Sequence, residues 1–340
     1  MMLLSLPGEL SLHILSELLE VVDISRLDVA CMSRASRRPL LDLLSKSVIL
    51  HVGTRLRTGG LTRGFIEYVA LRGLCLPFLK IHPTVCDTDI LLLEGTGVAG
   101  ACTSLSIESC KCITTIGAQR LISWCSSSVE FLNLAWSRTD DDCIRAVAES
   151  CRGLLALQVI SCDISDSSIV ALAQGCRHLA ELNLTYCVRI TDKAIGEIGR
   201  FLTSSLRTLS LSGCKRVTDA SLISLSGCHR LQSVDLNGCM LITDIGLTSL
   251  VTRAVLIDTL RINDCINLTD ASAVAVADSL AYLTVIGIQG LHHVTDIGII
   301  RIAQAYKTRL KRVDIYGCSY TEVGIAELNL LCPQLPPLWL

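Results

Sequence analysis

The chain has 340 residues, half of them hydrophobic, and a formal net charge of −2. It is long enough for two ordinary domains or one extended repeat array, and it can bury a large core. A charge this close to neutral gives no bulk attraction to nucleic acid or to an anionic membrane surface, so we expect neither partner. The sequence also lacks a signal peptide and an apolar stretch long enough to span a bilayer, which predicts a cytoplasmic or nuclear protein.

The first 46 residues predict a small bundle of three short amphipathic helices. Apolar residues recur there at helical spacing: first Leu10, Ile14 and Leu18, then Ile24 and Leu27. Such a bundle would be marginally stable alone, because it buries little apolar surface. We therefore expect it to rest on the next part of the chain, residues 47–75, which predicts an irregular first repeat or cap.

Residues 76–340 repeat a unit of 25 to 27 residues with the frame L-x-x-L-x-L-x-x-C. In the copy that begins at Leu206, Leu209 and Leu211 alternate as in a short strand, which places both side chains on one face. Leu222 and Leu225 then recur at the spacing of one helical stripe. The period and the frame are typical of leucine-rich repeats. Each unit thus predicts one short strand followed by one helix.

A Thr-Asp pair stands directly before five of the predicted helices. The pairs are Thr191-Asp192, Thr218-Asp219, Thr243-Asp244, Thr269-Asp270 and Thr295-Asp296. A short oxygen-bearing side chain there can accept the unpaired N–H groups of a helix start, as an N-cap. A strand, a turn and a capped helix cannot bury their apolar face alone. We therefore predict an α/β fold, a right-handed leucine-rich repeat solenoid (a horseshoe) with a concave parallel sheet and the helices outside.

Twelve of the eighteen cysteines follow the repeat. Seven come directly after a predicted strand and five near a helix end: Cys110, Cys162, Cys187, Cys214, Cys239, Cys265 and Cys318, then Cys125, Cys151, Cys176, Cys228 and Cys332. Free cysteine commonly fills such small buried positions. Zinc would need four converging ligands, and a reducing compartment disfavours disulfides. We predict no metal, no cofactor and no catalytic residue.

The sequence stops in mid-repeat. Its last residues, CPQLPPLWL from Cys332, align with CRHLAELNL from Cys176, so the chain ends just after a further predicted strand. Two interpretations stay open here. Either Pro333, Pro336 and Pro337 close the array, or the sequence is part of a longer array.

The N-terminal segment resembles an F-box, in the residues Leu6, Pro7, Glu9, Leu10, Ile14, Leu18, Asp23, Ile24, Leu27, Cys31 and Arg34. The repeats resemble the cysteine-containing class of leucine-rich repeats, although Ser137 and Leu291 replace the cysteine. Together the two parts look like the substrate-recognition subunit of an SCF-type E3 ubiquitin ligase. The resemblance implies a Skp-type adaptor and a cullin scaffold as partners. The implied adaptor-binding residues are Leu6, Pro7, Glu9, Leu10, Ile14, Leu18, Ile24 and Leu27.

The implied mechanism is proximity without catalysis, in which the receptor holds a protein substrate near a ubiquitin-loaded enzyme. The strand register predicts which side chains the concave face presents to that substrate. They are Lys80, His82, Glu108, Asn133, Trp136, Glu181, Asn183, Tyr186, Asp235, Asn237, Arg261, Asn263, Arg312, Asp314 and Tyr316. Charges of both signs are mixed among them, which suits a protein surface better than a polyanion.

A second interpretation gives the N-terminal helices a structural task alone. Every repeat array needs its apolar end covered, and these helices could serve only as that cap. The chain would then be a non-catalytic leucine-rich repeat scaffold without an adaptor site. A third class, a thiol-based metal or redox protein, would require the cysteines to converge.

Overall fold

The computed structural model describes residues 60–72, 76–97, 100 and 102–336. The chain divides into two units: unit 1 comprises Met1–Thr139 and Glu149–Leu154, and unit 2 comprises Asp140–Ala148 and Leu155–Leu340. The helices expected within residues 1–46, the first part of the predicted irregular repeat or cap (residues 47–59) and the last four residues lie outside the described residues.

Unit 1 alternates short strands with helices. Its elements are α5 (Arg63–Arg72), β1 (Phe78–Lys80), α6 (Asp87–Ile90), the 3-10 helix η3 (Leu91–Leu93), β2 (Ser104–Ser106), α7 (Thr115–Cys125) and β3 (Phe131–Asn133). The strands are parallel, with Leu79 opposite Leu105 and Leu105 opposite Leu132. These three leucines are buried, so they form one apolar row beneath the sheet of unit 1.

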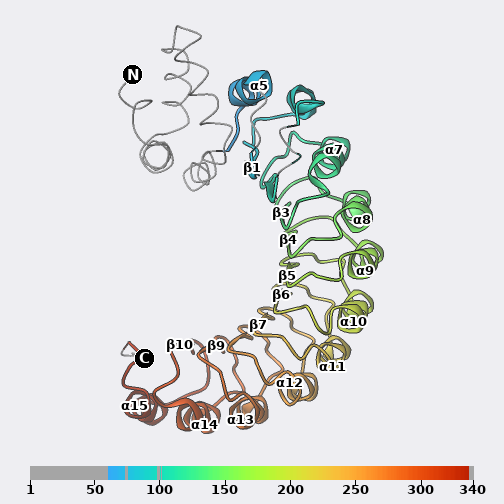
Figure 1. The fold of residues 1–340 in the computed structure, drawn as a ribbon. Coiled ribbons are helices and arrows are strands. Elements are labelled where there is room, and N and C mark those ends of the chain that lie inside the picture. Colours follow the sequence, from blue (N-terminus) through green and yellow to red (C-terminus); the bar gives the residue numbers. More distant parts are fainter. Residues whose placement is uncertain (1–59, 73–75, 98–99, 101, 337–340) are drawn as a thin grey trace, which may run out of the picture. The chain divides into compact units, whose positions relative to one another are not determined.

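Unit 2 continues the same alternation. Its elements are α8 (Asp141–Ser150, in unit 2 as far as Ala148), β4 (Ala156–Gln158), α9 (Asp166–Gly175), β5 (Glu181–Asn183), α10 (Asp192–Phe201), β6 (Thr208–Ser210), α11 (Asp219–Leu225), β7 (Ser233–Asp235), α12 (Asp244–Val251), β8 (Thr259–Arg261), α13 (Asp270–Ser279), β9 (Val285–Gly287), α14 (Asp296–Tyr306), β10 (Arg312–Asp314) and α15 (Glu322–Leu331). From β4 to β10, each strand pairs in parallel with the next strand along the chain. Within unit 2 the strands line the inner side and the helices the outer side (Figure 1).

The repeat that begins at Leu206 shows why these residues form this unit. Leu209 and Leu211 are buried on one face of β6 and its continuation, and Leu222 and Leu225 meet them from α11. The helix starts at Asp219 because the Thr218 hydroxyl accepts a hydrogen bond from the Ala220 amide at 3.2 Å. The predicted strand, helix and cap of this unit are thus confirmed.

The same cap recurs in the other repeats where it was predicted. Thr191, Thr243, Thr269 and Thr295 each accept a backbone amide at the start of the following helix. Parallel strands that alternate with capped helices confirm the predicted leucine-rich repeat solenoid. No helix in the described part of the chain is both long enough and apolar enough to cross a bilayer.

Candidate protein-binding face

The predicted binding residues lie on or just beyond the strands, at positions that alternate with the buried leucines. Lys80, Asn133, Glu181, Asn183, Asp235, Arg261, Arg312 and Asp314 belong to strands, and His82, Glu108, Asn237, Asn263 and Tyr316 follow one buried residue later. We call the surface that these residues form within each unit the strand face of that unit. The eight predicted adaptor-binding residues, from Leu6 to Leu27, lie outside the described residues.

Some predicted residues meet across neighbouring strands. In unit 1, the Lys80 ammonium lies 3.8 Å from the Glu108 carboxylate, which also accepts from the Asn133 amide group at 3.4 Å. In unit 2, Asp235 is paired in register with Arg261. Burial raises the pKa of Asp235, while the Asn237 N–H and Arg261 act in the opposite direction. On β10, Arg312 and Asp314 form an ion pair within one strand, at 3.1 Å.

Several polar residues of the strand face have a task inside the fold. The side-chain oxygens of Asn183 and Asp235 accept the backbone amides two residues further on, both at 3.0 Å. Asn237 and Asn263 instead accept the amides of Asn263 and Gln289 in the next repeat, both at 2.8 Å. An unpaired buried amide is costly, so these positions need an acceptor whether or not a partner binds.

Trp136 and Tyr186 stand at the turn that follows their strands, with positive φ values of 53° and 58°. Gly213, Gly238, Gly290 and Gly317 fill the equivalent place in other repeats, and glycine adopts this conformation at little cost. The Tyr186 ring occupies the space that a Cβ at Gly213 would need. Both aromatic side chains are about half exposed, at 48% and 58%. Their place in the turn is unfavourable for a large residue, which makes them candidates for contact with a partner.

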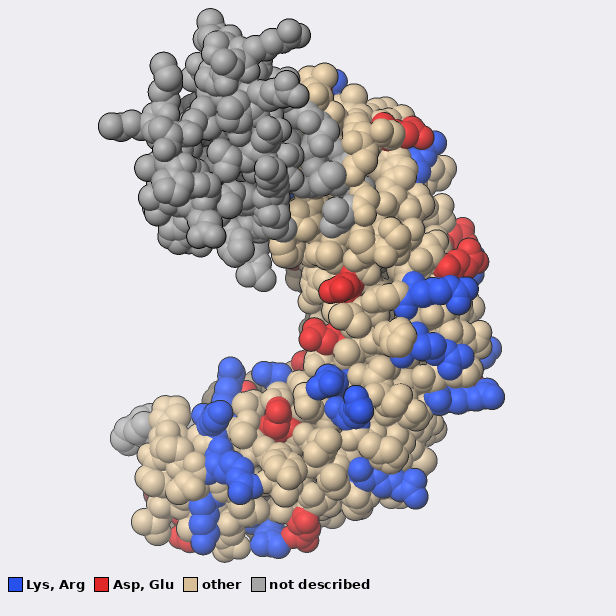
Figure 2. Space-filling model, in the orientation of Figure 1, with Lys and Arg blue, Asp and Glu red and all other residues tan. Residues whose placement is uncertain are grey.

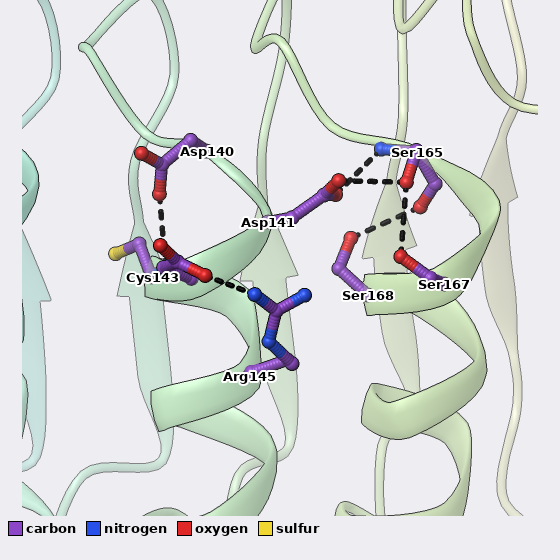
Figure 3. Close-up of polar contacts among 8 residues, drawn as sticks. Asp140, Asp141, Cys143, Arg145, Ser165, Ser167 and Ser168 are labelled. Carbon is purple, nitrogen blue, oxygen red and sulfur yellow. Dashed lines mark hydrogen bonds and ion pairs between the residues drawn. The ribbon is translucent and has the colours of Figure 1, made fainter.

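The structure also contains a hydrogen-bond ladder between repeats that the sequence analysis missed. In Figure 3, Asp141 at the start of α8 reaches Ser165, the residue at the N-cap position of α9. Its carboxylate accepts the Ser165 amide and hydroxyl, both at 2.7 Å. The same pair of bonds joins Asp244 to Thr269 at 3.0 and 2.7 Å. We call this arrangement the Asp-Thr ladder; its other steps run from Asp87, Asp166, Asp192, Asp219, Asp270 and Asp296 to the capping threonine of the next repeat.

Hydrogen bonding holds several ladder carboxylates in the ionised form. Burial favours the neutral acid at Asp192 and Asp244, but hydrogen bonds from serine and threonine outweigh it and lower both pKa values. The ladder carboxylate lies against the third residue of the helix in the following repeat, so that residue must have a small side chain. It is Ser221 beside Asp192, where the hydroxyl donates to the carboxylate, and Gly246 beside Asp219, where a Cβ would overlap the carboxylate.

The repeat cysteines are buried hydrogen-bond donors. Cys187, Cys214, Cys239 and Cys265 direct their thiols to the carbonyl of the buried residue just after the strand of the preceding repeat, at 3.0 to 3.2 Å. Burial raises the pKa of Cys187 to about 11 and that of Cys265 to about 12, so both stay protonated at neutral pH. The prediction of buried positions is confirmed for all twelve repeat cysteines except Cys318, which is half-buried. The described cysteines are free thiols, and no group of three or more potential metal ligands converges among the described residues.

The polar residues of the strand face divide into those committed to the fold and those left exposed. Asn183, Asp235, Asn237 and Asn263 have at least one acceptor committed to the backbone, whereas Glu181 and Tyr316 remain exposed. The Thr-Asp pairs were predicted only as caps. Each ladder aspartate lies 24 to 27 residues before the threonine or serine that it binds, which is close to the repeat period. The recurrence of aspartate and threonine at that period could have indicated the ladder between repeats.

Comparisons with known proteins agree with this architecture. A family model described as Leucine Rich repeat matches residues 175–199 and 204–226. The chain is 34% identical over 102 residues to a transport inhibitor response 1-like protein of Oryza sativa subsp. japonica. It is 29% identical over 153 residues to F-box/LRR-repeat protein 4 of Bos taurus. These matches cover 28% and 36% of this chain, but only 17% and 24% of the two relatives.

A solved structure extends the likeness of fold to most of the chain. The crystal structure of the Rad7 and Elc1 complex in yeast matches with a TM-score of 0.65 and 16% identity, over 92% of this chain and 85% of that one. At this identity the match concerns the fold alone. The repeats, the family model and this structural match agree on a leucine-rich repeat solenoid. In sequence, part of the chain is similar to part of an F-box/leucine-rich repeat protein.

Proposed function

We propose that the chain is the non-catalytic, substrate-recognition subunit of an SCF-type E3 ubiquitin ligase. The observation that carries the proposal is the strand face, which presents exposed side chains that the repeats do not need for their own packing. Glu181, Arg312 and Tyr316 are exposed in unit 2, as Trp136 is in unit 1. Exposed aromatic residues and arginine are common anchors of protein interfaces.

The N-terminal helices supply the link to the ligase in this proposal. The F-box pattern from Leu6 to Arg34 supports it, as does the relative named F-box/LRR-repeat protein 4. In the Rad7 structure, a protein of similar fold is in complex with a second protein, Elc1. By analogy, residues 1–46 bind a Skp-type adaptor, which connects the chain to a cullin scaffold.

The proposed role requires positioning and no bond chemistry. The strand face holds a substrate protein and so raises the local concentration of its lysines near the ubiquitin-loaded enzyme. The buried thiols suit this role, since burial keeps groups such as Cys187 protonated and unreactive. Free cysteines throughout the described residues also fit a reducing compartment, the cytoplasm or the nucleus.

A pull-down with a purified Skp-type adaptor tests the proposal on the full chain. We expect the adaptor to be captured by the wild-type protein and lost when Leu6→Ala is combined with Ile14→Asp. Lys215→Gln, an exposed change in the repeats of unit 2, is the matched control and should leave capture unchanged.

Two outcomes would refute adaptor binding. One is a failure of the intact chain to capture the adaptor. The other is undiminished capture by the Leu6→Ala, Ile14→Asp variant while circular dichroism shows it folded. Either result would favour the interpretation in which residues 1–46 only cap the solenoid.

A further inference from the structure

Although the net charge of the chain is near zero, the charges of unit 2 are unevenly distributed. Cations prevail on the edge where helices lead into strands. The six connections that run from the helices α9 to α14 to the following strands carry Arg177, Arg207, Arg230, Arg253, Lys307, Arg309 and Lys311, with Asp258 as their one carboxylate. We call this rim the basic edge. Figure 2, which views unit 2 from this side, shows Lys and Arg prevailing over Asp and Glu. From the sequence, mixed charges were expected only on the concave face, and no charge pattern was predicted for these connections.

Several cations of the basic edge are not paired with a carboxylate. Arg207, Arg230, Arg253 and Lys311 are exposed and form no ion pair with any residue that the structure describes. The lone carboxylate, Asp258, is half-buried and accepts a hydrogen bond from the Thr259 hydroxyl at 2.8 Å. The positive charge of this edge is therefore left for solvent or for a partner.

Two arginines of the basic edge are held in place without being neutralised. Arg177 donates to the Gln174 carbonyl at 2.8 Å, and its guanidinium lies 4.1 Å from the centre of the Phe201 ring. Arg309 donates to the Ala281 carbonyl. Carbonyl and ring contacts fix a guanidinium but leave its full charge, so less entropy is lost when an anion binds.

Helix dipoles account for only part of this charge. A cation in the last turn of a helix is favoured by the partial negative charge at the helix end, and the effect fades within that turn. Arg207 and Lys311 lie past that range, each directly before the first residue of a strand, β6 or β10. They stand next to the strand face, where their charge can reach anything bound there.

Exposed apolar side chains lie among these cations. Val255, Leu256 and Tyr282 belong to the same connections and are 43%, 40% and 59% exposed. A nucleic acid would use the cations and leave the aliphatic side chains uncovered, whereas an acidic segment with apolar residues would use both.

We propose that the basic edge of unit 2 binds an acidic segment of a partner protein that also carries apolar side chains. The segment lies across successive connections, its carboxylates facing Arg207, Arg230 and Lys311 and its apolar side chains on Val255, Leu256 and Tyr282. This inference rests on the proposed receptor function, since the edge borders the strand face and extends the surface offered to the same substrate.

Fluorescence anisotropy on the full chain tests the inference. The probe is a labelled peptide of alternating Glu and Leu, and a labelled single-stranded DNA of equal length is the second probe. The edge variant combines Arg207→Gln, Arg230→Gln and Lys311→Gln. The control variant removes three exposed cations elsewhere in the same unit: Lys193→Gln, Lys215→Gln and Arg216→Gln.

We expect the peptide to bind the wild-type chain, with affinity that falls as salt is raised. The edge variant should weaken binding at least about tenfold, and the control variant less than about twofold, because exposed charge pairs contribute modestly and locally. Tyr282→Ser should also weaken peptide binding while leaving the DNA signal unchanged.

Three results would overturn the inference: no peptide binding, an equal loss in the edge and control variants, or tighter binding of the DNA than of the peptide. A chain that still captures the Skp-type adaptor but gives one of these results loses only this inference. A chain that binds the peptide but not the adaptor loses only the ligase assignment.

Discussion

The two edges of unit 2 use charge in opposite ways. On the edge where strands lead into helices, Asp166, Asp192, Asp219, Asp244, Asp270 and Asp296 each give both carboxylate oxygens to the next repeat. On the basic edge, Arg207, Arg230 and Lys311 contact no carboxylate in the described chain. The first set of charges stabilises the stack of repeats, and the second is exposed to a partner.

This difference has a geometric origin. A short aspartate at the first residue of a helix sits beside the equivalent helix of the next repeat, so its carboxylate reaches that helix start directly. The negative charge is also favoured there by the helix dipole. Arginine and lysine are long, and at the opposite edge their charged ends extend into solvent while their stems cover the repeat. The same repeat period thus builds an internal ladder on one edge and an external patch on the other.

Removal of one ladder carboxylate should have the largest effect. Asp244 accepts hydrogen bonds from the Thr269 amide, the Thr269 hydroxyl and the Ser272 hydroxyl. Asp244→Ala should lower the free energy of unfolding by about 2–4 kcal/mol, because hydrogen bonds to a charged group are lost and the donors, half-buried Thr269 and buried Ser272, stay away from water. Urea denaturation followed by circular dichroism measures the change.

Glu322 provides the control for this substitution. It occupies the first position of α15, as Asp244 does in α12, but no capping threonine follows it in the described chain. Glu322→Ala should therefore cost only the dipole contribution, at most about 1 kcal/mol. Equal losses in the two variants would mean that the ladder contributes nothing beyond the helix dipole.

Crowding of the ladder should have the next largest effect. A Cβ at Gly246 would lie 2.8 Å from the backbone Cα of Asp219, too close for either group without a shift. Gly246→Ala should cost about 1–3 kcal/mol, as overpacked sites do. Gly196, in α10, has only the Ser224 hydroxyl near, at 3.9 Å, so Gly196→Ala should be neutral or stabilising. Thermal unfolding should show a lower midpoint for Gly246→Ala and an unchanged or higher midpoint for Gly196→Ala, and equal losses would contradict crowding at Gly246.

Most of the architecture could be predicted from the repeat frame, because strands, helices and their boundaries depend on patterns of nearby residues. Leu209 and Leu211 alternate, Leu222 and Leu225 follow a helical stripe, and Thr218 precedes them as a cap, so strand, helix and boundary could all be assigned locally. The Asp-Thr ladder could not be assigned this way, because its partners lie 24 to 27 residues apart and meet only when repeats stack.

The candidate site was predictable in register but not in role. Alternation placed Asn183, Asp235 and Asn237 on the strand face, yet it could not tell that their oxygens accept backbone amides. The basic edge could not be predicted from the sequence, because its cations are scattered at irregular positions in loops of different length. Arg207 and Lys311 form one surface only through the stacking of repeats.

Acid should destabilise the protein through the ladder. Hydrogen bonds outweigh burial and lower the pKa values of Asp141, Asp192 and Asp244 in the folded chain. A group whose folded pKa is depressed contributes fully above its unfolded value, about 3.9 for aspartate, and loses that contribution as pH falls through the folded value. The urea midpoint should therefore stay level between about pH 7 and pH 5 and fall below about pH 4. Asp244→Ala should show a shallower fall, and an identical fall would exclude Asp244 as a source of this acid sensitivity.

The most direct test of the contrast between the edges is the urea midpoint of two double variants in the same repeats. One combines Asp219→Ala with Asp244→Ala, and the other combines Arg207→Gln with Arg230→Gln. We predict a clearly lower midpoint for the aspartate variant and a free energy of unfolding within about 0.5 kcal/mol of wild type for the arginine variant. Equal losses, or a larger loss from the arginine variant, would contradict the assignment of the acidic edge to stability and the basic edge to binding.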